Sequence, residues 1–214
     1  MRIEMQAAGP FVQNGFVVAC EDTREAVIID PGEGVRDLLS FADGEQLSIR
    51  QILLTHAHVD HISGVGEAKR TLGVPIWLHR DDLFLYERAA EIGAMYGLRV
   101  EALPPVDTFY TPGEAIAFGR LRARPHHTPG HCPGGVCLEI GPETTAGKDL
   151  FVGDTLFAGS IGRTDLPGGD YATLLASIRG VLFAFGDDAR VYSGHGPATT
   201  IGRERRTNPF LTSV

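Results

Sequence analysis

The chain has 214 residues, of which 19 are basic and 27 acidic, so its formal net charge is −8. This length is enough to bury a hydrophobic core, and with 43% hydrophobic residues the composition is that of a folded globular chain. The acidic balance argues against a nucleic-acid partner, which is bound through positive surface. We therefore expect one domain over residues 1–214.

The sequence also bears on where the protein works. Its longest apolar runs, such as 26–29, are far shorter than the roughly 20 residues that cross a membrane. The N-terminus shows no signal-peptide pattern. Cys20, Cys132 and Cys137 cannot all pair with one another, which favours a reducing compartment. We expect a cytoplasmic protein with no membrane partner.

Short apolar runs bounded by turn residues predict strands, and apolar residues at helical spacing predict helices. In chain order we expect strands at 16–20 and 26–29, a helix at 33–43, a strand at 49–54, a helix at 61–72, a strand at 74–78, a helix at 81–97, strands at 115–118, 121–125, 135–140 and 150–152, a helix at 171–185, a strand at 190–192 and then a basic tail. Such a mixture indicates sheet flanked by helices, in an α/β or α+β layered architecture.

Three of the eight histidines lie in one short segment, residues 55–61, which reads Thr-His-Ala-His-Val-Asp-His directly after the strand at 49–54. Residues i and i+2 at a strand end point to one side, so His56 and His58 can aim at one point. Asp60 and His61 follow as the chain turns into a helix, and they can aim at a neighbouring point. Imidazole and carboxylate ligands suit zinc, iron or manganese, so this segment predicts metal binding.

Three later segments each place one ligand-type residue beside glycine at the end of a strand. They are Thr-Pro-Gly-His at 128–131, Val-Gly-Asp-Thr at 152–155 and Ser-Gly-His-Gly-Pro at 193–197. Glycine permits tight turns and a close approach of the backbone to a ligand. Each segment is therefore expected to deliver one ligand to a shared site.

This series of motifs, in its order and spacing from residue 10 to 200, resembles the signature of the metallo-β-lactamase superfamily. Residues 159–165 and 201–210 are similar to those of short bacterial glyoxalase II-like hydrolases, which lack a C-terminal helical domain. The resemblance implies a four-layer αββα sandwich with the metals at one edge of two facing sheets.

The resemblance also implies a ligand set for two divalent metal ions. His56, His58 and His131 would hold the first ion. Asp60, His61 and His195 would hold the second. Asp154 would bridge the two. Zinc fits these ligands, and iron and manganese accept them as well.

The implied activity is hydrolysis of a thioester, with S-lactoylglutathione as the expected substrate and lactate and glutathione as products, as in methylglyoxal detoxification. A metal-bound hydroxide, available near neutral pH, would attack the acyl carbonyl, and the metals would take up the oxyanion charge. The thiol of the leaving group has a pKa of about 8.5, so the thiolate can leave with little help from protonation. Asp60 and Asp154 are the expected catalytic carboxylates.

Four further residues are candidate substrate contacts. Arg203 and Arg206, with Arg205, could bind the carboxylates of glutathione, unless this tail is simply held by salt bridges to the acidic body. Arg163 and Asp165 lie just past Asp154. Asp165 could orient a ligating histidine, or the segment could be a plain turn.

Other interpretations stay open at this point. A persulfide dioxygenase would use one iron on His56 or His58, His131 and Asp154. A hydrolase of another ester, a lactone or a β-lactam would use the dinuclear site. Tyr96 is a candidate for lining a substrate cleft, as is Tyr86. Cys132 is either a small packing residue or a reactive thiol near the metals. For His79, His126 and His127 we expect structural hydrogen bonds.

Overall fold

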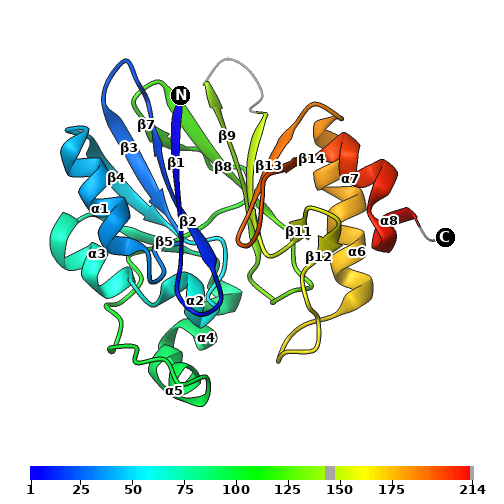
Figure 1. The fold of residues 1–214 in the computed structure, drawn as a ribbon, viewed down its shortest axis with the longest axis horizontal. Coiled ribbons are helices and arrows are strands. Elements are labelled where there is room, and N and C mark those ends of the chain that lie inside the picture. The colour runs from blue at the N-terminus through cyan, green and yellow to red at the C-terminus, as the bar shows by residue number, and fades with distance from the viewer. Residues whose placement is uncertain (143–147, 213–214) are drawn as a thin grey trace.

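The computed structural model describes residues 1–142 and 148–212. Two six-stranded sheets face each other, and helices cover the outer face of each, so that four layers follow one another across the molecule (Figure 1). This is the αββα sandwich that the resemblance implies.

The first sheet has the strand order β1-β2-β3-β4-β5-β6. Its strands are β1 (Arg2–Ala8), β2 (Gln13–Ala19), β3 (Glu25–Ile29), β4 (Ser48–Leu53), β5 (Ile76–Leu78) and β6 (Thr108–Phe109). The first three strands are antiparallel, and from β3 to β6 all neighbours are parallel. The parallel crossovers carry α1 (Val35–Gly44) and α3 (Val65–Leu72), which cover the outer face.

The second sheet has the order β14-β13-β10-β9-β8-β7. Its strands are β7 (Ile116–Phe118), β8 (Leu121–His127), β9 (Val136–Pro142), β10 (Asp149–Gly153), β13 (Arg190–Ser193) and β14 (Thr199–Thr200). Only β10 and β13 are parallel neighbours among these strands, and the connection between them carries α6 (Tyr171–Gly180). Helices α6, α7 (Ile201–Thr207) and α8 (Pro209–Thr212) lie on the outer side of this sheet (Figure 1).

The central strands are buried on both faces, which explains their uninterrupted apolar runs. In β2, Phe16 and Val18 join Phe151 of β10 in the core between the sheets. The alternate residues Val17 and Ala19 pack into the core under the helices of the first sheet. A third apolar cluster lies between the second sheet and α6. The four layers are therefore held by three separate hydrophobic cores.

Three predicted helices differ in the structure. The helix expected at 61–72 is two helices, α2 (Val59–Ile62) and α3, which are separated by Ser63 and Gly64. The segment 81–97 forms a 3-10 turn (Arg80–Asp82), α4 (Leu83–Glu87) and α5 (Ala89–Met95), because the backbone leaves the helical conformation at Arg88. The segment 171–185 is α-helical only as far as Gly180 and ends in a 3-10 turn, Leu182–Phe185.

The structure also contains elements that the sequence did not predict. Strand β1 is an edge strand with partly exposed residues, so it carries no continuous apolar run. Two short strands, β11 (Leu156–Phe157) and β12 (Ser160–Ile161), form a hairpin after the second sheet's β10. The expected basic tail forms β14, α7 and α8, and the hydroxyl of Thr200 accepts the Arg203 N–H to cap α7. Across the described ranges, the structure contains no helix with the length and apolar character needed to span a bilayer.

Candidate metal centre

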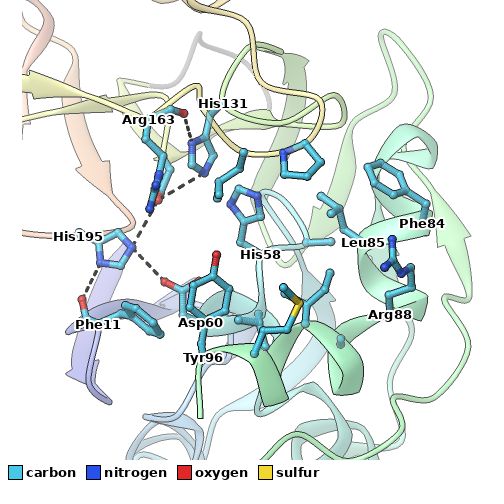
Figure 2. A pocket seen from close by; sticks show the side chains of 18 of the residues that line it. Phe11, His58, Asp60, Phe84, Leu85, Arg88, Tyr96, His131, Arg163 and His195 are labelled. Carbon is cyan, nitrogen blue, oxygen red and sulfur yellow. Dashed lines mark hydrogen bonds and ion pairs between the residues drawn. The ribbon is translucent and has the colours of Figure 1, made fainter. Parts of the chain in front are cut away.

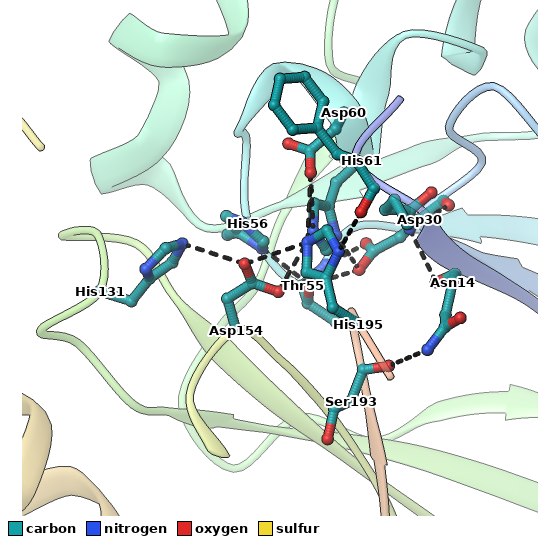
Figure 3. Close-up of polar contacts among 12 residues, drawn as sticks. Asn14, Asp30, Thr55, His56, Asp60, His61, His131, Asp154, Ser193 and His195 are labelled. Atoms are coloured by element: carbon teal, nitrogen blue, oxygen red, sulfur yellow. Dashed lines mark hydrogen bonds and ion pairs between the residues drawn. The ribbon is translucent and has the colours of Figure 1, made fainter. Parts of the chain in front are cut away.

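Four chain segments meet at one edge of the two sheets, each immediately after a strand. Residues 55–61 follow β4, His131 lies in the turn between β8 and β9, Asp154 follows β10, and His195 follows β13. Figure 3 shows the convergence of side chains from these segments. The structure thus brings together all the candidate ligands, His56, His58, Asp60, His61, His131, Asp154 and His195.

The ligand atoms form two groups of three. Those of His56, His58 and His131 lie within 4.8 Å of one another, and those of Asp60, His61 and His195 do the same.

Asp154 lies between the two groups. Its Oδ2 is 3.6 Å from His131 Nε2 and 3.4 Å from His195 Nε2, and its Oδ1 is 3.3 Å from His61 Nε2. One carboxylate therefore reaches both groups, and the arrangement fits a dinuclear centre.

Several of these atoms are buried without a hydrogen-bond partner. They are the Nε2 atoms of His56, His61 and His131 and the Oδ1 atom of Asp154. A buried polar atom left unpaired costs about 1–3 kcal/mol, so several at one point call for an explanation. Metal ions at this point would satisfy all of them, and the residues present fit such ions.

A buried carboxylate orients two of the ligands. Asp30 Oδ2 accepts a hydrogen bond from His61 Nδ1 at 2.9 Å and one from the Thr55 hydroxyl at 2.5 Å. Thr55 Oγ1 in turn lies 3.1 Å from His56 Nδ1, which donates to it. Both imidazoles therefore present Nε2 to the centre.

Asp30 has a backbone φ of 46°, a left-handed conformation that is uncommon outside glycine, and it is 1% exposed. Asp30 directly follows the strand predicted at 26–29, and nothing in its local sequence marks it as part of a site. The signal that could have found it is the parallel pairing of β3 with β4, which sets Asp30 beside Thr55.

Main-chain carbonyls orient two more ligands. His131 Nδ1 donates to the carbonyl oxygen of Arg163 at 2.8 Å, and His195 Nδ1 donates to that of Phe11 at 3.0 Å. The backbone carbonyl of Arg163 therefore orients His131, a role that the sequence had suggested for Asp165. The Asp165 carboxylate instead pairs with the Arg163 guanidinium through two bonds of 2.7 Å.

The two groups differ electrostatically in the metal-free protein. Burial and the neighbouring imidazoles lower the pKa of His58 to about 3 and hold that of His56 well below its ordinary range. Burial also acts to lower the pKa of His195, but its hydrogen bonds to Asp154 and Asp60 prevail and raise it to about 10. His56 and His58 of the first group are therefore neutral imidazoles, while His195 of the second group carries a proton that a bound ion displaces.

A second buried carboxylate joins the two loops of the first group. Asp82 accepts hydrogen bonds from the N–H of Ala57 at 3.0 Å and of Gly134 at 2.6 Å, and from the Cys132 thiol at 3.2 Å. Asp82 is fully buried, and burial raises its pKa. The local sequence around Asp82 gives no sign of this role, because its partners are 25 to 52 residues away in the chain.

Burial also raises the pKa of the Cys132 thiol well above its ordinary value, which matches a packing residue and not a reactive thiol.

The remaining histidines make structural contacts, as expected. His126 Nε2 lies 2.9 Å from Glu139 Oε2, and His127 Nε2 donates to the Pro133 carbonyl at 2.8 Å. The rings of His79 and His127 stack with their centroids 4.1 Å apart.

A cavity of about 590 Å³ opens beside the centre (Figure 2). Its wall on the metal side is formed by His58, Asp60, His131, Asp154 and His195. Tyr96 lines the cavity, as considered from the sequence. Tyr86 does not; it is buried and its hydroxyl donates to the Pro104 carbonyl at 2.8 Å.

The four candidate substrate residues fall in two places. Arg163 lines the cavity, with Asp165 as its ion-pair partner. Arg203 and Arg206 lie on α7 and are not part of the cavity wall; Arg206 pairs with Asp187 at 3.0 Å.

Comparison with known proteins agrees with the geometry. The family described as the metallo-β-lactamase superfamily matches residues 8–195, and the chain belongs to this superfamily of metallo-hydrolases, which bind divalent metals. The hydroxyacylglutathione hydrolase GloC of Haemophilus influenzae is 40% identical, over 100% of this chain and 99% of its own length.

Two solved structures are also similar. The crystal structure of the B3 metallo-β-lactamase BLEG-1 superimposes with a TM-score of 0.90 at 39% identity, over 99% of this chain and 100% of its own. The crystal structure of TTHA1623 in a di-iron-bound form has a TM-score of 0.86 at 39% identity, over 97% of this chain and 100% of its own.

Proposed function

We propose that the protein hydrolyses a glutathione thioester of the S-lactoylglutathione type, releasing the acid and free glutathione. The observation that carries this is the carboxylate of Asp154, which reaches both groups of candidate ligands and also lines the cavity. The full-length similarity to a protein named hydroxyacylglutathione hydrolase supports the choice of thioester.

In the reaction, the oxygen of water bonds to the carbonyl carbon and the carbon–sulfur bond breaks. One proton of the water ends on the thiol sulfur and the other on the carboxylic acid, which ionises in solution. When bound, divalent ions supply Lewis acidity that makes water nucleophilic near neutral pH.

The chain's own residues position the reactants. Asp60 and Asp154 both line the cavity, and Asp60 Oδ2 lies 3.2 Å from His195 Nε2. We propose that these two carboxylates orient the attacking water and balance the charge around it. The thiolate leaves readily because the pKa of its thiol is about 8.5, so the reaction needs no strong general acid.

Two guanidinium groups line the cavity and suit the carboxylates of glutathione. Arg88 pairs with Glu91 at 2.7 and 2.9 Å, and Arg163 pairs with Asp165. All four side chains are exposed, and exposed ion pairs contribute little to stability, so exchange for a substrate carboxylate costs little. Arg88 was not among the candidates named from the sequence, because nothing in its local pattern sets it apart from a solvated helix residue.

We propose zinc for both metal positions, with iron as the alternative to measure, since the similar TTHA1623 was solved in a di-iron form. The cytoplasmic location stays a prediction; Cys20, Cys132 and Cys137 are free and buried.

β-Lactam hydrolysis is a second candidate, because a structure with a TM-score of 0.90 to this chain is that of a B3 metallo-β-lactamase. The persulfide dioxygenase alternative needs only His56 or His58, His131 and Asp154, and the presence of a second complete group, Asp60, His61 and His195, argues against it.

One panel of assays separates these functions. Metal-loaded protein is given S-lactoylglutathione, a cephalosporin, or glutathione persulfide with oxygen, at equal concentrations. We expect the thioester to be hydrolysed with a kcat/KM at least about a hundredfold above that for the β-lactam, without oxygen uptake. Faster β-lactam opening, or oxygen uptake with the persulfide, would overturn the proposal.

A further inference from the structure

Large apolar side chains that are exposed gather around the mouth of the cavity. Phe11, Phe84, Met95 and Tyr96 are between 41% and 77% exposed, and all line it. The rings of Phe11 and Tyr96 touch edge to face with centroids 6.0 Å apart. A contiguous patch of exposed apolar side chains often marks a binding site, whereas single exposed apolar residues are normal on protein surfaces.

The interior of the same cavity is also apolar. Leu85 and Ile92 come from α4 and α5, and Phe157, Ile161 and Leu166 come from the segment after β10. Figure 2 shows the metal-side residues His58 and Asp60 beside this wall, with Phe84 and Leu85 farther along it. Of the two cavity arginines, Arg163 lies near His131 on the metal side and Arg88 lies beside Leu85 (Figure 2). The rest of the wall away from the metal side is hydrocarbon.

A lactoyl group does not match such a cavity. It has one methyl group beyond the hydroxyl-bearing carbon, and one methyl group covers little of a wall built from large aliphatic and aromatic side chains. The glutathione portion is charged and suits the exposed arginines, Arg88 and Arg163. The apolar walls are therefore left for the acyl portion.

We infer that the preferred substrate carries a large apolar acyl group, aromatic or branched aliphatic, which fills the cavity beside the metal centre. This inference rests on the proposed thioester hydrolysis for the identity of the scissile bond. It goes beyond the proposed function in the acyl group: the lactoyl thioester is still cleaved, but less efficiently than a thioester with a large apolar acyl group.

The test compares two thioesters of glutathione that differ in one substituent, S-lactoylglutathione with a methyl group and S-mandeloylglutathione with a phenyl group. Because the phenyl ring would be buried against the apolar wall, we expect the kcat/KM of the mandeloyl thioester to be higher by roughly tenfold or more. A double substitution, Phe84→Ala with Tyr96→Ala, is expected to bring the ratio of the two values close to one.

Phe210→Ala is the matched control. Phe210 is 41% exposed, like Phe84, but lies on α8 and not in the cavity wall, so the ratio should not change. A lactoyl thioester cleaved as fast as the mandeloyl one, or faster, overturns the inference and leaves thioester hydrolysis standing.

If neither thioester is cleaved, thioester hydrolysis fails, and binding then decides the inference by itself. Calorimetry compares the thioethers S-methylglutathione and S-benzylglutathione, which cannot be hydrolysed. Binding of the benzyl compound roughly tenfold tighter, lost in the Phe84→Ala, Tyr96→Ala variant, supports an apolar site for this substituent. Equal affinities overturn it.

Discussion

Asp30 and His61 form a buried pair in which the carboxylate, 2.9 Å from Nδ1, fixes the imidazole with Nε2 toward the candidate metal centre. The same carboxylate holds Thr55 through its N–H and its hydroxyl. One side chain at the end of β3 thus orients a ligand of the second group and the start of the segment that carries four ligands.

Replacing this carboxylate should weaken the second metal position. In Asp30→Asn the amide can donate to His61 Nδ1, which turns the imidazole's proton toward the metal side. We expect metal affinity at the second position to fall about 10- to 100-fold, with the first position less affected. Competition with a chelator measures both. Asp22→Asn, at an exposed surface pair with Arg120, is the control; equal affinities in the two variants would contradict this role.

Asp82 should support the first group in a different way. Asp82→Ala leaves the N–H groups of Ala57 and Gly134 buried without their acceptor. Leaving such groups unsatisfied predicts a loss of about 1–3 kcal/mol for each in the free energy of unfolding. Chemical denaturation of the metal-free protein measures it. Asp188→Ala, at an exposed pair with Lys148, should lower the free energy by less than about 1 kcal/mol. A similar loss in both variants would refute a bracing role for Asp82.

Gly194 lies so close to the centre that a side chain does not fit. A Cβ at this position would collide with Asp154 Oδ1 and His61 Cε1. Gly194→Ala should displace these ligands and reduce the hydrolysis rate by about 100-fold or more, because small misplacements of reacting groups are costly. Gly44→Ala is the control, since a Cβ there meets nothing within 4 Å. Wild-type activity in Gly194→Ala would show that the close approach is unimportant.

Removing the metals should make stability depend on pH in the alkaline range. The pKa of His195 is raised from 6.5 to about 10 in the metal-free protein. A raised pKa means that the folded state binds the proton more tightly, so this stabilisation is fully present below pH 6.5 and is lost as pH rises toward 10. The Tm of chelated protein should therefore fall over that interval more steeply than the Tm of His195→Gln. Parallel curves would contradict the raised pKa.

The sequence predicted the candidate ligands better than the residues that orient them. His131, Asp154 and His195 each follow a strand and sit beside glycine, so local pattern located them. Asp30 and Asp82 act through contacts 25 to 52 residues away, and no local pattern reveals such contacts.

In the fold, too, features with a strong local sequence pattern were predicted, and features that depend on distant contacts were not. The doubly buried strands β2 and β3 carry strong apolar runs and were predicted, whereas the half-exposed edge strand β1 was not. The position of Arg203 and Arg206 depends on the cap at Thr200 and on the pairing with Asp187, which fold the expected tail back against the body. The cavity wall is assembled from α4, α5 and loops of both halves, so only the three-dimensional structure shows that it is apolar.

The most direct test of the account is a metal titration of metal-free protein with S-lactoylglutathione as the common substrate. The rate of thioester hydrolysis is measured together with the number of ions bound per chain. The account predicts a rate that rises to a plateau at two divalent ions per chain and is lost in Asp154→Ala. A plateau at one ion, or two bound ions with no hydrolysis of either the lactoyl or the mandeloyl thioester, would contradict it.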